Sequence, residues 1–200
     1  MPSTSATLSN ADFSLRKWLL IGVLAELAIF GYCYAIQPEL NEVFRHAARY
    51  SGRLSLLLYL LTLTYFALTF HDTAPGVLAT VKKLAIIFCV CHLIHFGFLT
   101  TNVVLNGIEP VPFKLAGGFV GYLMIVLYPF LIDRIRNKKL HFIYFLYVGV
   151  VIIGTYMARI KGEFPGAEPG PVHYFGAGAT VLALLVFGWM IFGARPQVQG

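Results

Sequence analysis

The chain has 200 residues, of which 58% are hydrophobic and 12% charged, with a formal net charge of +6. Because roughly a quarter of the residues in a soluble domain are charged, this composition excludes an ordinary soluble protein and indicates an integral membrane protein. The excess of positive charge does not indicate a nucleic-acid partner, because the basic residues lie beside apolar runs, where they set orientation and meet anionic membrane lipid.

Six apolar runs approach the length of about 20 residues that a membrane-spanning helix needs. They cover residues 18–36, 54–70, 84–101, 115–132, 140–158 and 172–193, between polar tails at 1–17 and 194–200. The pattern predicts an all-α integral membrane six-helix bundle. No length remains for a flavin or nicotinamide module, and the chain has no Gly-rich dinucleotide fingerprint.

The distribution of Lys and Arg predicts the orientation. No small-residue cleavage signature follows the first tail, so we expect the first span to be retained. With six spans both termini lie on one side, and that side carries nine of the 15 Lys and Arg residues, including the cluster at 133–139. The positive-inside rule therefore predicts cytoplasmic termini, and we expect the membrane to be a bacterial-type inner (plasma) membrane.

The first span carries an acidic residue, Glu26, close to the middle of the bilayer. Its depth matches that of His92 and His95 in the third span. We expect Glu26 to partner one of them, as the acceptor for a ring N–H or as half of a proton-conducting pair. The alternative is a protonated Glu26 bonded to a backbone carbonyl. Residues 37–53, which follow, are expected to form an outer loop with a short interfacial helix.

The third span sets two imidazoles in an otherwise apolar run, KKLAIIFCVCHLIHFGFLTT at 82–101. At 100° per residue, His92 and His95 share one helix face. An ionisable side chain in hydrocarbon faces the bundle interior and marks a functional site by default. With a rise of 1.5 Å per residue, the two lie roughly 14 and 18 Å from the cytoplasmic end of the span.

The remaining candidate side chains lie at two other positions along the membrane normal. His141 is the second residue of the fifth span, near the inner interface, and His71 is at the same level. A depth difference of about 15 Å prevents His95 and His141 from sharing one iron. His173 and Tyr156 belong to the outer level.

Three short patterns carry a family resemblance over about residues 50–157. The second span opens with Gly52 and Arg53 and reaches Thr62 and Leu63; a basic pair precedes His95 by about twelve residues; and a second basic stretch precedes the pair Leu140 and His141. This order resembles the ferric-reductase-like transmembrane family, and within it the haem-binding membrane subunit of periplasmic methionine sulfoxide reductases. The resemblance implies haem b with histidine axial ligands, so that His95 or His141 would hold the iron. It also implies a quinone or flavoprotein donor and a periplasmic acceptor protein.

The chain departs from that family at the ligand positions. The family's second histidine on the fifth span corresponds to Gly154, and some members have a histidine near Lys82 that would complete an inner pair with His141. His95 or His92 would then pair with His173, or His141 with His71, or one histidine would hold haem opposite water or Tyr156. The fourth alternative is that the fold persists without haem.

Three classes of function follow from these alternatives. The first is a transmembrane electron-transfer subunit, a non-autonomous part of an oxidoreductase, in which the cofactor supplies the redox chemistry. The second is a proton or small-solute carrier with Glu26, His92 and His95 as its polar relay. The third is a scaffold subunit that has lost its cofactor.

Overall fold

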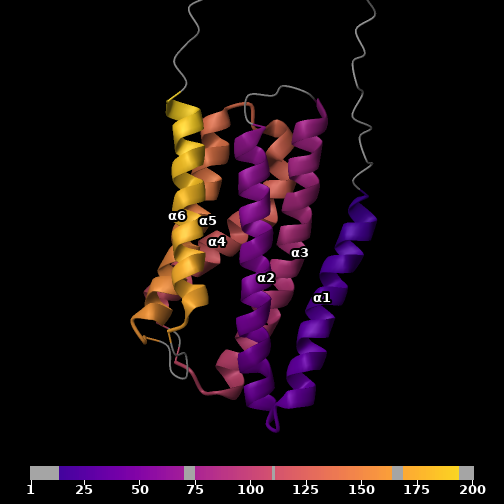
Figure 1. Ribbon diagram of the computed structural model, residues 1–200, viewed down its shortest axis with the longest axis vertical. Helices are drawn as coiled ribbons and strands as arrows, with labels where there is room; N and C mark the ends of the chain where they lie inside the picture. The colour runs from indigo at the N-terminus through magenta and orange to yellow at the C-terminus, as the bar shows by residue number, and fades with distance from the viewer. Residues whose placement is uncertain (1–13, 70–74, 110, 164–168, 194–200) are drawn as a thin grey trace, which may run out of the picture.

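A computed structural model describes residues 14–69, 75–109, 111–163 and 169–193, and within these ranges helix is the only regular secondary structure, with no strand. The bundle in Figure 1 consists of α1 (Leu15–Ile36), α2 (Leu40–Leu68), α3 (Pro75–Leu105), α4 (Pro112–Leu131), the short 3₁₀ helix η1 (Ile132–Arg134), α5 (Lys138–Ile160) and α6 (Pro171–Phe192). The predicted all-α six-helix bundle is confirmed. His71 lies outside the described residues.

All six α-helices are long and apolar enough to cross a membrane, so the chain is a multi-pass membrane protein. The start of α1 and the end of α6 lie at one end of the bundle, the terminal end (Figure 1). The ends of α1, α3 and α5 and the starts of α2, α4 and α6 lie at the other, the loop end.

Local sequence signals set several helix boundaries. The Ser14 hydroxyl accepts from the Lys17 N–H at the start of α1, and the Asn137 side chain accepts from the Lys139 N–H at the start of α5. Both satisfy N–H groups that have no partner within the helix. Proline is the first residue of α4 and of α6, where its missing N–H and fixed φ are tolerated.

Helix α2 begins 14 residues earlier than the predicted second span, at Leu40 rather than Leu54. The expected outer loop at 37–53 is therefore reduced to a short turn, and the expected interfacial helix is continuous with the span. Packing explains the difference, because Val43 and Ala47 of α2 are buried with Cys33 of α1. The polar residues of this segment are typical of an interfacial helix, but its apolar residues pack inside the bundle.

Aromatic side chains fill the centre of the bundle between α2, α3, α5 and α6. Tyr59, Phe88, Phe145 and Phe187 have almost no exposed surface. The Tyr59 hydroxyl donates to the Phe145 carbonyl at 2.7 Å, which satisfies the one polar group in this set. Helix α1 lies along α2 and α3 and leans away from them toward the terminal end (Figure 1).

Candidate functional site

The two histidines of α3 share one helix face, as predicted, and both lie against α2. A hydrogen bond of 2.5 Å joins His92 Nδ1 to the Ser55 hydroxyl. On its other side the His92 ring stacks on Tyr122 of α4, with 4.5 Å between ring centroids and 24° between the planes. His92 is therefore held between three helices.

His95 occupies space left by a glycine on α2. A Cβ placed on Gly52 would lie 3.1 Å from His95 Cε1, so a larger residue there would press on the ring. The His95 ring forms a hydrogen bond with the backbone of Ala48, which lies on α2 one turn before Gly52. Its Nδ1 atom is buried and has no hydrogen-bond partner within the described ranges. The His92 and His95 ring centroids are 5.5 Å apart.

Glu26 reaches the same level from α1 and is only 1% exposed. Its carboxyl group lies beside the Ser51 hydroxyl of α2 and within electrostatic range of the Cys91 thiol of α3. The approach of α1 to α3 depends on Gly22, where a Cβ would lie 2.8 Å from Cys91 Sγ.

The structure does not form the expected direct pair between Glu26 and a histidine. Neither Glu26 carboxyl oxygen completes a hydrogen bond to any described residue, and the same is true of the Ser51 hydroxyl. The physical reason is the rotation of α3: Cys91 lies toward Glu26, and the next residue, His92, points about 100° away around the helix, where it meets Ser55 of α2. The predicted common depth nevertheless holds, because Glu26 lies beside Cys91, the residue next to His92.

We call Glu26, Ser51, Ser55, His92 and His95 the intramembrane polar cluster. Four of its buried polar atoms lack partners in the part of the chain that the structure describes: both Glu26 carboxyl oxygens, Ser51 Oγ and His95 Nδ1. A buried polar atom without a hydrogen bond is destabilising by about 1–3 kcal/mol. Buried polar atoms of this kind are ordinarily bridged by water that makes two to four hydrogen bonds.

Sequence reasoning identified three members of the cluster and missed its serines and Tyr122. Ser51 and Ser55 are four residues apart, so they share one face of α2, and this spacing is the signal that could have found them. Tyr122 had no such signal, because only the packing of α4 against α3 brings its ring to His92.

At the loop end, Arg159 of α5 lies between the intramembrane polar cluster and the two residues predicted at the outer level, Tyr156 and His173. Arg159 lies within electrostatic range of His95, of Tyr156 and of His173. Tyr156 and His173 lie together, with 5.8 Å between ring centroids. The Nδ1 atom of His173 accepts from the Gly170 N–H at 3.0 Å, so this histidine caps the start of α6.

His141 forms a complete hydrogen-bonded unit near the terminal end and is only 3% exposed. Its Nε2 lies 3.2 Å from the Ile135 carbonyl, which can only accept, so Nε2 carries the proton. Its Nδ1 therefore accepts from the Tyr128 hydroxyl at 2.8 Å. With both nitrogens occupied, His141 stabilises the junction between α4 and α5.

Neither the two histidines of α3 with each other nor His141 with a free ring nitrogen forms the bis-imidazole pair that the family resemblance implies. Bis-imidazole ligation needs two histidines that face each other across the macrocycle. His92 and His95 are on one helix, and both nitrogens of His141 are engaged. Gly154 is exposed with open space around it, so that position points away from the bundle interior. No group of three or more His, Cys, Asp or Glu suited to a metal ion occurs in the described ranges.

Comparison of the chain with protein-family models, with curated proteins and with solved structures finds no match. The family resemblance and the haem it implies therefore stay predictions from the sequence.

Proposed function

We propose that this multi-pass membrane protein moves protons through the membrane by way of the intramembrane polar cluster. One observation carries the proposal: proton-exchanging side chains from α1, α2 and α3 meet at one depth, and several of their buried atoms lack hydrogen-bond partners among the described residues. Ionisable residues inside a membrane bundle mark proton relays and ion pathways.

The chemistry of each group suits proton transfer. Imidazole is the side chain whose unperturbed titration falls nearest neutral pH, and its two nitrogens can take up and release a proton on different sides of the ring. A serine hydroxyl both donates and accepts. Protons would pass between Ser55 and His92 along their hydrogen bond and between the two imidazoles through one intervening water. Glu26 and Ser51 would join this path through a second water, because Ser51 lies beside Glu26 and one turn from Ser55 on α2.

The orientation belongs to the proposal as well. We place the chain in a bacterial-type inner membrane with both termini in the cytoplasm, on the strength of the positive-inside count. The loop end, with Arg159 and His173, then faces the outer side. The cluster lies between this outer group and the aromatic core.

The electron-transfer function predicted from the family resemblance makes a different demand on the chain. It requires haem b, a quinone or flavoprotein donor and a periplasmic acceptor protein. The proton proposal requires none of these, and it uses the side chains that the bundle brings together. A scaffold function would require neither a cofactor nor flux.

Proton flux into proteoliposomes tests the proposal. The full chain is reconstituted with a pH-sensitive dye inside the vesicles, and a pH gradient is imposed. We expect flux above that of empty vesicles, and a fall of about tenfold or more in His95→Gln and in Glu26→Gln, because positioned acid–base groups contribute about 10²-fold or more to proton transfer.

Two matched variants control for the loss of a histidine or an acid as such. His46→Gln and Glu39→Gln change the same residue types at the loop end, outside the cluster, and should keep wild-type flux. Flux equal to that of empty vesicles would contradict the proposal. If flux is absent, an oxidised-minus-reduced visible spectrum of the same samples, with haem supplied during expression, separates the two remaining functions: a b-type signal supports electron transfer, and a colourless protein supports the scaffold.

A further inference from the structure

Helices α2, α5 and α6 bring three side chains with hydrogen-bond donors together at the loop end, Arg53, Tyr156 and His173. The Tyr156 and His173 ring centroids are 5.8 Å apart, and Arg53 lies within electrostatic range of both. Tyr156 packs closely on α6 because a Cβ at Gly176 would lie 2.9 Å from its Cε1 atom, and the same Cβ would lie 3.0 Å from Leu56 of α2. The three helices therefore meet at this level, and we call Arg53, Tyr156 and His173 the loop-end donor site.

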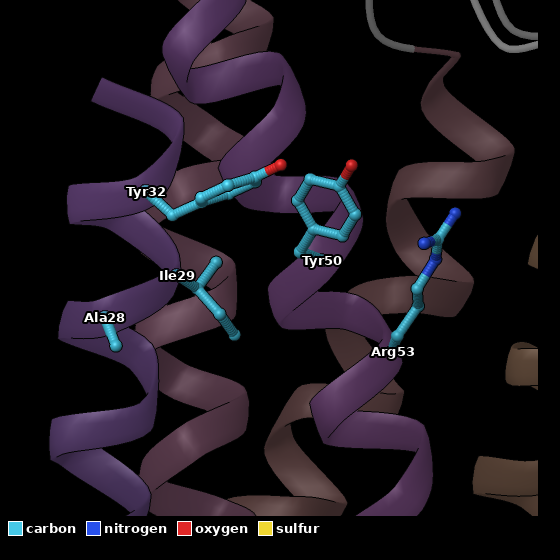
Figure 2. A pocket seen from close by; sticks show the side chains of 5 residues that line it. All are labelled: Ala28, Ile29, Tyr32, Tyr50 and Arg53. Carbon is cyan, nitrogen blue, oxygen red and sulfur yellow. The ribbon is translucent and has the colours of Figure 1, made fainter. Parts of the chain in front are cut away.

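The Arg53 side chain is turned away from α1, and its N–H groups are available to a ligand. Figure 2 shows Tyr50 between α1 and Arg53, with the guanidinium directed toward the loop end. The guanidinium carbon lies 5.0 Å from the centre of the Tyr50 ring, a cation–π contact that positions the group without using its N–H donors. No hydrogen bond or ion pair joins this guanidinium to another residue in the described ranges.

The other two donors are nearly buried and also lack acceptors. The Nδ1 atom of His173 accepts from the Gly170 N–H, so the neutral ring carries its proton on Nε2. His173 is 5% exposed and Tyr156 is 9% exposed. In the part of the chain that the structure describes, neither His173 Nε2 nor the Tyr156 hydroxyl forms a hydrogen bond. Three donors thus lie together where the described residues supply no acceptor.

The electrostatic surroundings of the donor site are positive. The charged groups within electrostatic range of His173, among the described residues, are Arg53, Arg49 and Arg159. Arg49 and Arg159 contribute through their charge, which acts at a distance whatever hydrogen bonds they make themselves. Water would satisfy the three donors, but only an anion also offsets the charge.

The acidic residues nearest to these arginines do not neutralise them. Glu42 of α2 pairs with Arg45, which is not part of the donor site. Glu163, four residues after Arg159, brings one carboxylate against three guanidinium groups. A net positive charge therefore remains.

We propose that the loop-end donor site binds an oxyanion, either a small soluble anion or the phosphate of an anionic lipid. The forked N–H groups of Arg53 match a pair of phosphate or carboxylate oxygens. Tyr156 and His173 donate to the same group from α5 and α6. This inference is independent of the proton proposal, since it uses none of the residues of the intramembrane polar cluster.

Calorimetric titration of the full chain with inorganic phosphate tests the proposal, in a non-ionic detergent and at an ionic strength held constant with chloride. We expect saturable binding. Arg53→Gln should raise the Kd about tenfold or more, since it removes a charged donor, and Tyr156→Phe about fivefold, since it removes a neutral one.

Two matched variants control for charge and for loss of a hydroxyl as such. Lys161→Gln removes one positive charge from an exposed position at the loop end, and Tyr32→Phe removes the hydroxyl of an exposed tyrosine on α1. Both should keep the wild-type Kd. Equal weakening in Arg53→Gln and Lys161→Gln, or a Tyr156→Phe variant that binds as tightly as Tyr32→Phe, would overturn the proposal.

Native mass spectrometry with added phosphatidylglycerol or phosphatidylcholine identifies the source of the anion. Preferential retention of phosphatidylglycerol, lost in Arg53→Gln, supports the site with a lipid headgroup as its ligand. Phosphate binding without such retention supports the site with a soluble anion. Neither phosphate binding nor preferential retention of phosphatidylglycerol would overturn the proposal.

Discussion

At the scale of single residues, Gly149 determines how closely α5 approaches its neighbours. A Cβ at this position would lie 2.6 Å from the Tyr59 hydroxyl and 2.7 Å from Leu184 Cδ1. The Tyr59 hydroxyl is also fixed by its bond to the Phe145 carbonyl, so it has little freedom to move away. The contact between α2, α5 and α6 therefore depends on glycine at this point.

Gly149→Ala should destabilise the bundle by about 1–3 kcal/mol, because an added methyl group in a close-packed core forces neighbours out of position. Unfolding in detergent, followed by circular dichroism, measures the change. Gly154→Ala is the matched control on the same helix, because that position is exposed and a Cβ there would meet nothing within 4 Å. Equal stability of the two variants would show that the helices are not packed as described.

The histidines show how far residue-level prediction from sequence reaches. Spacing predicted that His92 and His95 face the bundle together, and depth predicted that His141 lies apart from them. The sequence could not show that His141 is fully hydrogen-bonded, because Tyr128 belongs to a different helix and meets it only after α4 and α5 have packed. It also could not show that Ser55, rather than Glu26, would meet His92.

At the scale of helices, a polar network joins α2 to α3 at the loop end. Arg45 Nη2 donates to Asn106 Oδ1 at 2.5 Å, while Arg45 Nη1 donates to Glu42. The Asn106 amide group donates in turn to the Asn41 and Asn102 carbonyls. This network fixes the last turn of α3 beside the first turns of α2.

Asn106→Ala should loosen this end of α3, since it removes the acceptor for Arg45 and the donor to Asn41. We expect a loss of about 1 kcal/mol, the net value of a typical hydrogen bond, and faster hydrogen exchange of backbone amides at 102–108. Thr100→Ala serves as the comparison, because its exposed hydroxyl bonds only carbonyls of its own helix. Exchange that is unchanged in Asn106→Ala would show that the network does not hold the helix end.

The six helices were predictable because apolar length is a strong signal in a membrane protein. The start of α2 was not, because residues 40–53 mix charged and apolar side chains in a pattern that also suits an interfacial helix. Their assignment depends on the contacts of Val43 and Ala47 with α1, which hydropathy does not register.

At the scale of the whole molecule, the rotation of each helix about its axis decides what the bundle can bind. Sequence gives the depth of a residue along a span, whereas rotation is set by packing against neighbouring helices. Depth correctly placed Glu26 level with the α3 histidines. Rotation turned Gly154 outward and directed Ser51 and Ser55 inward, which left the polar cluster, rather than a pair of haem ligands, as the main buried polar feature.

Proton exchange between water and the His95 ring tests this account most directly. Solid-state ¹⁵N NMR of histidine-labelled protein in lipid bilayers, with magnetisation transferred from water, measures it for each imidazole. We predict transfer to His95 and His92 in wild type, weaker transfer in Glu26→Gln, and little transfer to His141, whose nitrogens are both occupied. Absence of transfer to His95 and His92 in wild type would contradict the proposed proton pathway.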